Sequence, residues 1–582
     1  MNEKLLAGLA TFAMLIAACG PTISPTATPT RPPSPTSVQA TSTPAPAGGT
    51  PSNPSPTPAK TASPTAAVAG PSYGGTIYHP QRSDPPSWDP TLTTVDPMAT
   101  SRNIAFNKLF TQWPDPIANC TSTLTPVLVK DWKWLDDTTA EMTLKPGIKF
   151  HNKAPVNGRE LVAQDVATSM ERYRSLVEMT GFTRLVDKVD VVDKYTFRFK
   201  LKQPWGGLAV EMLSTHSGLW LAAQESGGAR GELWTDPEKS WIGTGPFMFD
   251  KWTPGVKWSM VKNPEYWGKG KPYVDRVEYL VMPDTSTQLA AMRSGRLNLI
   301  RDLNQVLIGE LEKEVSGLQV VRCTAFGYSG ANILFMNSSG PPFNDVRVRR
   351  AVAMSVDRQA IVDTAYGGRA AVLGVLAPNV KYAVAIKDFP PDLRQYVEYH
   401  PDRAKALLAD AGYGKGLDLT LNINTQYPAP ASAIAEMIIA MLGQVGIRAK
   451  LKPMSSTEFS NTVLQAKYPA GEMAITPILQ QTPEDGNALR NPSSKYSSTN
   501  NRSMINDPEY DRIYEEFITS RDEAKRTELA RQLQFRHVDQ AYRVILPLGE
   551  STMVGRPDVH NIFWIGGARE YGPVMENIWV AH

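Results

Sequence analysis

The segment that decides the fold class reads PPFNDVRVRRAVAMSVDRQAIVDTAYGG and runs from Pro341 to Gly368. Apolar side chains recur at helical spacing from Val346 to Ser355, directly after Asn344-Asp345, and both of these side chains are favourable helix N-caps. Asp357 can cap a second helix, which the glycine pair at the end of the segment stops. The segment therefore predicts two consecutive helices.

Strand patterns follow helix patterns on both sides of this segment. Ile434 to Val445 is an apolar helix pattern ended by Gly446, and Ile447 to Leu451 then alternates as a strand does. Ser286 to Ser294 followed by Leu297 to Ile300 repeats the same helix and strand order. Such alternation is typical of α/β layers.

Composition narrows the classes of protein. The chain has 582 residues, which is too long for a single compact core. Hydrophobic residues make up 42% of it and charged residues 20%, and this composition excludes a chain that is disordered throughout. A net charge of +3 argues against a nucleic-acid-binding protein or a polybasic membrane protein. Three cysteines exclude a disulfide scaffold and a cysteine-rich metal site.

The N-terminus has the pattern of an export signal. Lys4 precedes an apolar run from Leu5 to Ala18, which is too short to span a membrane. The run ends Ile16-Ala17-Ala18-Cys19, which resembles the lipobox of bacterial lipoproteins. The resemblance implies a signal peptide of residues 1–18, cleavage before Cys19 and a lipid on that cysteine. The alternative is an ordinary secretory signal with a chance cysteine.

Residues 19–72 are predicted to form a disordered tether. After the cysteine this stretch is almost wholly Pro, Thr, Ser, Ala and Gly, with Arg31 and Lys60 as its only charged residues. Such a composition cannot bury a core and favours a partly polyproline coil. We expect no chemistry from the tether itself.

Motifs for catalysis, metals and cofactors are missing. The seven histidines are scattered without a His-Glu-x-x-His pair, and there is no Gly-x-Ser-x-Gly or phosphate-binding loop. Gly243-Thr244-Gly245-Pro246-Phe247 resembles half a dinucleotide fingerprint, but it lacks the third glycine and is better interpreted as a turn into a strand. The sequence therefore predicts neither an enzyme, nor a cofactor, nor a metal site.

Five blocks in order resemble the extracellular solute-binding protein family 5 of ATP-binding-cassette importers, the peptide- and nickel-binding group. The resemblance covers the chain from about Tyr73 to the C-terminus. The blocks are Leu144 to His151 with Asp165-Val166, Gly243 to Phe247 through Lys262 to Trp267, Asn337 with Pro341 to Ala351, Ala404 to Tyr413, and Gly446-Ile447.

The resemblance implies an α/β fold of the two-lobed periplasmic-binding-protein type II, with an extra subdomain in the first lobe. The two lobes would close over a ligand about a hinge. By analogy, lobe I comprises 73–107, 226–327 and 546–582, the extra subdomain comprises 108–225, and lobe II comprises 328–545.

The resemblance defines the fold more clearly than it defines the residues that contact the ligand. In peptide-binding members an Asp in a Trp-x-x-Asp-Tyr segment pairs with the peptide amino group, whereas residues 478–485 here have no Trp and no Asp at the matching place. Glu484 or Asp485 could substitute. His151 lies inside a fold motif, which argues against a nickel ligand there. The ligand-binding candidates are Trp113, in the loop after Leu109-Phe110, together with Trp220, Tyr328, Gln480, Gln481, Asp485 and Trp564.

Together these features predict a lipid-anchored receptor on the outer face of the cytoplasmic membrane. It would bind a small solute, a peptide or an oligosaccharide, and deliver it to importer permease subunits with a cytoplasmic ATPase. We expect a monomer that binds no nucleic acid. A sensory or surface-binding lipoprotein with the same fold is the alternative, and a secreted hydrolase is disfavoured. Cys120 and Cys323 could pair or stay as thiols.

Overall fold

The structure is a computed structural model in which the described residues lie within one compact unit, Ala69–His582. None of the helices among these residues is long and apolar enough to cross a membrane. The described residues are 70–91, 96–114, 122–175, 185–208, 219–227, 232–323, 332–378, 381–425, 427, 430–477, 489, 492–494, 501–562 and 575–581.

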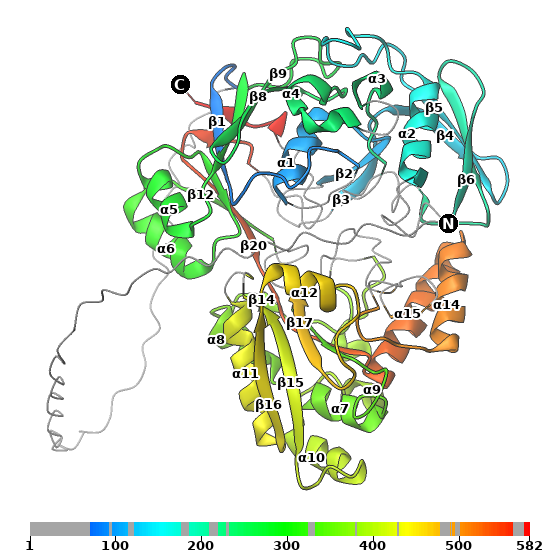
Figure 1. Cartoon of the computed structure of the whole chain (residues 1–582), viewed down its shortest axis with the longest axis vertical. Helices are drawn as coiled ribbons and strands as arrows, with labels where there is room; N and C mark the ends of the chain where they lie inside the picture. Colours follow the sequence, from blue (N-terminus) through cyan, green and yellow to red (C-terminus); the bar gives the residue numbers. More distant parts are fainter. Residues whose placement is uncertain are drawn as a thin grey trace, which may run out of the picture. The chain divides into compact units, whose positions relative to one another are not determined.

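Two groups of elements are visible within this unit (Figure 1), and we name them the upper region and the lower region. The upper region comprises the described residues of 70–323 and 551–581, and the lower region those of 332–549. Among the described strands, each pairs only with strands of its own region.

The upper region contains two four-stranded sheets and three smaller ones among the described strands. In the sheet of order β1-β10-β9-β8, β1 is parallel to β10 and the other pairs are antiparallel. The sheet β4-β5-β7-β6 is antiparallel throughout. The strands are β1 (Thr76–Gln81), β2 (Phe110–Pro114), β3 (Ser122–Pro126), β4 (Val129–Trp134), β5 (Thr139–Leu144), β6 (Val186–Val191), β7 (Thr196–Leu201), β8 (Phe247–Thr253), β9 (Lys257–Lys262), β10 (Arg276–Val281), β11 (Leu299–Arg301), β12 (Gln319–Cys323), β20 (Ser551–Gly555), β21 (Val559–His560) and β22 (Trp579–Val580).

Short helices surround these sheets. They are α1 (Asp96–Ala105), α2 (Ala163–Ser175), α3 (Gln224–Gly227), α4 (Pro237–Ser240), α5 (Thr285–Arg293) and α6 (Gln305–Glu314), with a 3₁₀ turn at Glu232–Thr235. The predicted turn before β8 is confirmed, and its glycines have a further reason. A Cβ atom at Gly243 or Gly245 would overlap the carbonyl oxygen of Ala105 or Ile104, so two backbones approach closely here.

One mixed sheet of five strands organises the lower region, in the order β16-β15-β17-β13-β18. Strand β15 is parallel to β16 and β17, and β13 is antiparallel to β17 and β18. The strands are β13 (Asn332–Met336), β14 (Ala370–Ala371), β15 (Leu417–Asn424), β16 (Ile447–Met454), β17 (Met473–Pro477), β18 (Arg543–Ile545) and β19 (Leu548–Gly549).

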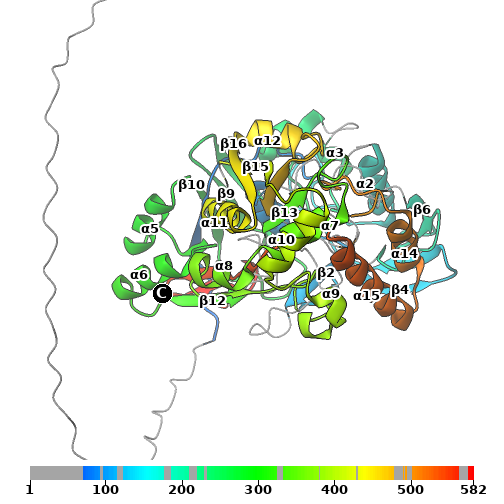
Figure 2. The same cartoon turned by 90° about the horizontal axis from the view of Figure 1, so that it is seen from below.

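Helices α7 (Val346–Met354), α8 (Arg358–Ala365), α10 (Pro401–Asp410) and α11 (Ala431–Gln444) pack with one face of this sheet in a common apolar core (Figures 1 and 2). The predicted caps are confirmed, because Asp345 accepts a hydrogen bond from the Arg347 backbone N–H and Asp357 accepts one from Ala360. The remaining described helices are α9 (Pro391–Arg394), α12 (Ser456–Thr462), α14 (Pro508–Thr519) and α15 (Glu523–Gln540), with a 3₁₀ turn at Ile386–Asp388.

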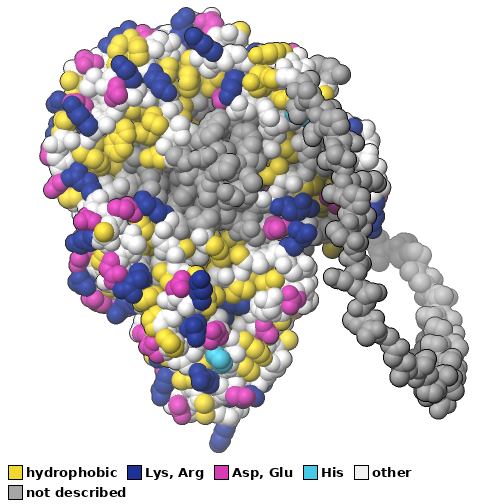
Figure 3. Space-filling view, turned by 180° about the vertical axis from the view of Figure 1, so that it is seen from behind, with side chains coloured by type: hydrophobic (Ala, Val, Ile, Leu, Met, Phe, Trp, Pro, Cys, Tyr) yellow, Lys and Arg dark blue, Asp and Glu magenta, His cyan; other side chains and the backbone are white. Residues whose placement is uncertain are grey.

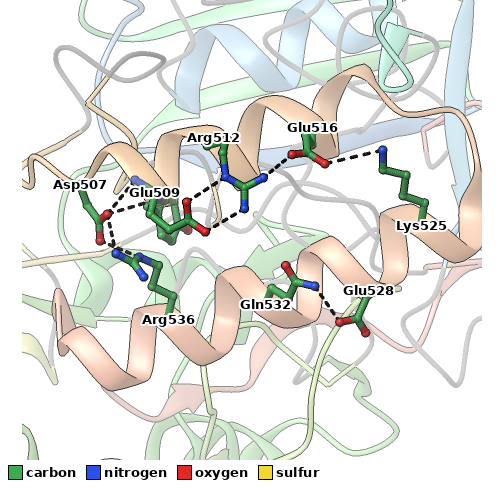
Figure 4. A network of polar contacts seen from close by, with 9 residues as sticks. Asp507, Glu509, Arg512, Glu516, Lys525, Glu528, Gln532 and Arg536 are labelled. Carbon is green, nitrogen blue, oxygen red and sulfur yellow. Dashed lines mark hydrogen bonds and ion pairs between the residues drawn. The ribbon is translucent and has the colours of Figure 1, made fainter.

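Charged side chains tie α14 to α15 (Figure 4). The carboxylate of Asp507 caps α14 and accepts two hydrogen bonds, of 2.7 and 2.8 Å, from the Arg536 guanidinium on α15. Along α14, Arg512 bonds both Glu509 and Glu516, and Glu516 lies 3.6 Å from Lys525 of α15. The two helices therefore form a braced antiparallel pair.

Candidate functional site

The five-stranded sheet has a second face, opposite the helices α7, α8, α10 and α11. On β13, Leu334 and Met336 belong to the core shared with those helices. Ile333 and Phe335 point the other way and belong to a different apolar core, which also contains residues of the upper region. This second face therefore lies on the side of the upper region, where a site between the two regions would be built.

Two arginines lie over Phe335 on this face. Arg543 of β18 is the cross-strand neighbour of Phe335, and its guanidinium carbon lies 6.0 Å from the ring centroid. The guanidinium carbon of Arg502 lies 5.7 Å from the same centroid. A cation at about 6 Å or less from an aromatic centroid is attracted by the ring quadrupole.

A rigid turn positions Arg502. The side chain of Asn501 bonds both the N–H and the C=O of Ile505, and Met504 adopts a positive φ of 51°. The carbonyl oxygen of Arg502 accepts a hydrogen bond of 2.6 Å from the Tyr468 hydroxyl. The backbone that carries Arg502 is therefore fixed by side chains of the lower region.

The guanidinium of Arg502 has few hydrogen-bond partners and no paired carboxylate among the described residues. Its Nη1 donates a hydrogen bond of 3.3 Å to the Thr476 hydroxyl, and its Nε is buried without a hydrogen-bond partner among the described residues. Burial lowers the pKa of Arg502, and the phenols of Tyr427 and Tyr468 oppose the shift only in part. Among the described residues, no carboxylate is one of the groups that shift its pKa. The residue as a whole is half-buried, and its Nε is buried.

Glu550 lies where the chain passes from the lower to the upper region. It follows β19 of the lower region and directly precedes β20 of the upper region. One of its carboxylate oxygens accepts a hydrogen bond of 3.1 Å from Gln305 and lies 3.7 Å from Arg369 and 3.9 Å from Arg322. Arg322 belongs to the upper region and Arg369 to the lower, so this carboxylate links both.

A second set of contacts joins the two regions at the α14–α15 turn. Arg521 pairs with Asp137, donates a hydrogen bond of 3.2 Å to the Asp136 carbonyl and lies 4.9 Å from the centroid of Trp134. The N–H of Gly206 donates a hydrogen bond of 2.9 Å to the carbonyl of Ile518. These contacts connect the β4-β5-β7-β6 subdomain to the lower region.

Trp220 is the ligand-binding candidate whose side chain the structure describes. Only 2% of it is exposed. The Arg102 guanidinium lies 4.7 Å and the Lys108 ammonium 4.6 Å from its ring centroid, and its backbone N–H donates to the Tyr173 hydroxyl. The structure thus places Trp220 in a buried cation–π cluster of the upper region.

The other candidates divide into two groups. Trp113 lies in β2, paired with Thr123, so the expectation that it lies in a loop is wrong, and its side chain lies outside the described part. Cys323 ends β12. Tyr328, Gln480, Gln481, Asp485, Trp564, Cys19 and Cys120 lie outside the described residues.

Sequence reasoning did not single out Phe335, Arg502 or Arg543. Phe335 resembles any other residue of a buried strand, and Arg502 stands in a polar turn between Asn501 and Ser503. Their contact depends on the pairing of distant segments. A basic residue in a turn with no acidic neighbour within several positions was the one signal available.

The described residues contain no cluster of three or more His, Cys, Asp or Glu side chains that could hold a metal ion. His151 has the structural role expected from its motif. Its Nε2 lies 3.0 Å from the Gly245 carbonyl oxygen, its Nδ1 accepts from the Gly243 N–H, and burial lowers its pKa to about 4.

Comparison with solved structures defines the fold. The structure superposes on a periplasmic binding protein of Helicobacter pylori in complex with the peptide STSA, with a TM-score of 0.73, 22% identity and coverage of 88% of this chain and 99% of that one. A Bacillus subtilis oligopeptide-binding protein in complex with a nonapeptide gives a TM-score of 0.71, 21% identity and coverage of 88% and 100%. The fold is the two-lobed α/β type of class II periplasmic binding proteins, with an extra domain.

The chain belongs to the bacterial extracellular solute-binding proteins, family 5, whose model matches residues 123–499. These are solute-binding proteins of ATP-binding-cassette importers and not enzymes. The chain is similar to heme-binding protein A of Haemophilus influenzae, at 26% identity over 70% of this chain and 76% of that protein. It is also similar to di/tripeptide-binding protein 1 of Pseudomonas aeruginosa, at 26% identity over 74% and 81%.

Proposed function

We propose that this protein is the lipid-anchored solute-binding component of an importer, which captures a short peptide between its two lobes and delivers it to the permease. The lobes are those expected from the sequence: 73–107, 226–327 and 546–582 for lobe I, with the extra subdomain at 108–225, and 328–545 for lobe II. Membership of the solute-binding family over residues 123–499 is the observation that carries the proposal.

Hinge closure is the motion that this proposal requires. The chain passes from one lobe to the other at Glu550 and β20, and the Glu550 carboxylate has partners in both lobes. The contact between Arg521 and Asp137 forms at a separate place, between the extra subdomain and lobe II. It supports a closed arrangement in which both lobes meet around the solute.

The names of similar proteins support a peptide as the solute. Relatives include di/tripeptide-binding proteins and a dipeptide-binding protein, and two of the superposed structures hold peptides. Other relatives are named for heme and glutathione. An oligosaccharide, the other solute expected from the sequence, is the competing outcome of the binding test.

The N-terminal pattern supports the anchor. A lipid on Cys19 and the Pro- and Thr-rich stretch 19–72 would hold the folded unit near the outer face of the membrane. The test is metabolic labelling with a palmitate analogue, comparing the full chain with Cys19→Ser. We expect label on the wild type alone, and equal labelling of both would contradict the proposal.

The binding function is tested on the purified full-length protein. Short peptides and oligosaccharides are screened by thermal shift, and each solute that stabilises the protein is titrated by calorimetry. A ligand that binds only the folded state raises stability by RT ln(1 + [L]/Kd), so about 100-fold excess over Kd gives roughly 2.7 kcal/mol. We expect stabilisation by at least one peptide. Stabilisation by oligosaccharides alone would change the solute class, and none by either would contradict the function.

A further inference from the structure

The extra subdomain, proposed at residues 108–225, has polar contacts on two sides. On one side it meets the rest of the upper region, and on the other it meets the turn between α14 and α15 of the lower region (Figures 1 and 2). A backbone hydrogen bond crosses each junction. The His151 N–H donates to the Gly243 carbonyl at 2.8 Å, and the Gly206 N–H donates to the Ile518 carbonyl at 2.9 Å. The strengths of the two junctions can therefore be compared through matched amides.

Buried polar groups hold the junction with the rest of the upper region. The His151 ring is fully buried, and its Nε2 lies 3.0 Å from the Gly245 carbonyl oxygen. Arg172 of the subdomain pairs with Asp89, of which only 4% of the side chain is exposed. Parting such buried partners leaves desolvated polar groups without a partner, which is strongly unfavourable. This junction therefore resists opening.

Exposed groups contribute much of the junction with the lower region. Arg521 pairs with Asp137, of which 75% of the side chain is exposed, and its guanidinium carbon lies 4.9 Å from the Trp134 ring centroid. An exposed ion pair changes an equilibrium constant by about 1.5- to 5-fold, and a backbone hydrogen bond by about 2- to 10-fold. Since water replaces both kinds of contact readily, this junction opens at a smaller cost than the other.

The same junction is closely fitted around Gly206. A Cβ atom at this position would overlap the Ser520 carbonyl oxygen and the Arg526 guanidinium, so the subdomain and the α14–α15 turn touch here without spare room. Next to it, Trp205 is buried in the apolar core that the two regions share. The structure thus has this junction in its closed form.

We propose that the extra subdomain is a latch: it moves with the upper region, and its contact with the α14–α15 turn opens when the two regions part and forms again when they meet. The latch comprises Asp137 and Gly206 of the subdomain with Ile518 and Arg521 of the lower region. The inference rests on the proposed function, in which closure of the lobes captures the solute. The latch would then slow the release of a bound solute without touching it.

Amide hydrogen exchange of the purified full-length protein, without added solute, tests the latch. Mass spectrometry with fragmentation to single residues compares the amide of Gly206 with that of His151. We expect the protection factor of Gly206 to be at least about 10-fold lower, because the latch opens in the native state and the other junction opens only with wider unfolding. Equal protection of the two amides would overturn the proposal, since both junctions would then open together.

Two variants weaken the latch in different ways. Asp137→Asn removes the ion pair and should speed exchange at Gly206 by about 1.5- to 5-fold. Gly206→Ala should speed exchange of the amide at that position by at least about 10-fold, because the new Cβ overlaps the Ser520 carbonyl oxygen. Neither variant should change the His151 amide. An unchanged rate at position 206 in either variant, or an equal rise at His151, would overturn the proposal.

The control is Arg512→Gln, which removes a charge from the exposed surface of α14, where Arg512 pairs with Glu509 and Glu516 (Figure 4). We expect it to change neither amide. A rise at Gly206 equal to that in D137N would show that any loss of charge on this surface acts alike, and would overturn the role of the Arg521–Asp137 pair.

A measurement with solute links the latch to binding. With saturating dipeptide Met-Leu we expect the Gly206 amide to gain at least about 5-fold in protection, and D137N and G206A to release the peptide faster at a similar association rate. Binding that leaves the Gly206 amide unchanged would overturn the latch and leave the binding function intact. Absence of Met-Leu binding would count against the peptide function alone, and the exchange without solute still decides whether the latch opens.

Discussion

Arg521, between α14 and α15, forms an ion pair with Asp137, between β4 and β5, and thereby joins the lower region to the upper region. The same guanidinium donates a hydrogen bond to the Asp136 carbonyl and lies over Trp134. Because 75% of the Asp137 side chain is exposed, water and salt screen the pair, so it biases the arrangement of the lobes without locking it.

The first prediction concerns this ion pair. In a double-mutant cycle of Arg521→Gln and Asp137→Asn, we expect a coupling of about 0.2–1 kcal/mol in the free energy of unfolding at low salt. The coupling should shrink at high NaCl. Urea unfolding of the four proteins measures it, and strictly additive effects at low salt would show that the pair does not form in solution.

A pair of glycine substitutions tests the packing before β8. Gly243→Ala should destabilise the protein by about 1–3 kcal/mol, because the new Cβ would overlap the Ala105 carbonyl oxygen. Gly309→Ala is the matched control, in the middle of α6, where an added Cβ would meet no other part of the protein within 4 Å. It should stabilise by about 0.5–1 kcal/mol. The midpoints of denaturant unfolding measure both changes in stability. If both variants were stabilised, or both destabilised, the result would contradict the close approach of the two backbones at Gly243.

Two identical substitutions compare Arg358, which has three hydrogen bonds to backbone carbonyls, with Arg502, which has one hydrogen bond to a hydroxyl. Arg358→Met should cost at least about 2 kcal/mol of stability, because the carbonyls of Ile545, Ala353 and Val356 lose their donor. Arg502→Met removes a charge that no described carboxylate compensates, so we expect a change within about 1 kcal/mol or a gain. A larger loss for Arg502→Met would assign that residue a structural role.

Because three histidines are buried, we expect the free energy of unfolding to decrease in mild acid. Burial lowers the pKa of His151 to about 4 and that of His79 to about 3, and it holds the pKa of His537 well below its usual value. The unfolded chain protonates these rings near pH 6.5, so it binds more protons than the folded protein between pH 6.5 and about 4. Stability is therefore present in full above pH 6.5 and is lost as the pH falls, by up to about 1.4 kcal/mol per pH unit per ring.

His151→Gln tests this origin. The variant should lower the slope of unfolding free energy between pH 6.5 and 5 by up to about 1.4 kcal/mol per pH unit, since one of the buried rings is removed. Urea unfolding across this range gives the slopes, and an unchanged slope in the His151 variant would contradict the assignment.

Local signals predict the helices well. Asp345 and Asp357 cap α7 and α8 as their positions indicate, because a cap is decided by three or four neighbouring residues. The sequence predicts a loop at Trp113 because the residues between it and its partner strand, Ser122–Pro126, have no strand pattern. Propensity within one segment does not reveal such pairing.

The candidate site depends on contacts that no local pattern encodes. Arg502 lies in a polar segment whose sequence is typical of any surface loop, and the sequence around Phe335 is typical of any buried strand. Only the order of strands β17 and β13 in the sheet brings the Thr476–Arg502 pair over the Phe335 ring. Charge totals give no hint either, since acidic and basic side chains are interspersed over the face shown in Figure 3.

We propose that this protein binds a small solute and leaves it chemically unchanged. Native mass spectrometry of the full-length protein, incubated with a synthetic pool of di- to pentapeptides, tests it most directly. We expect one intact peptide per protein chain. A spectrum without any bound peptide, or with bound cleavage products in place of intact peptides, would contradict the account.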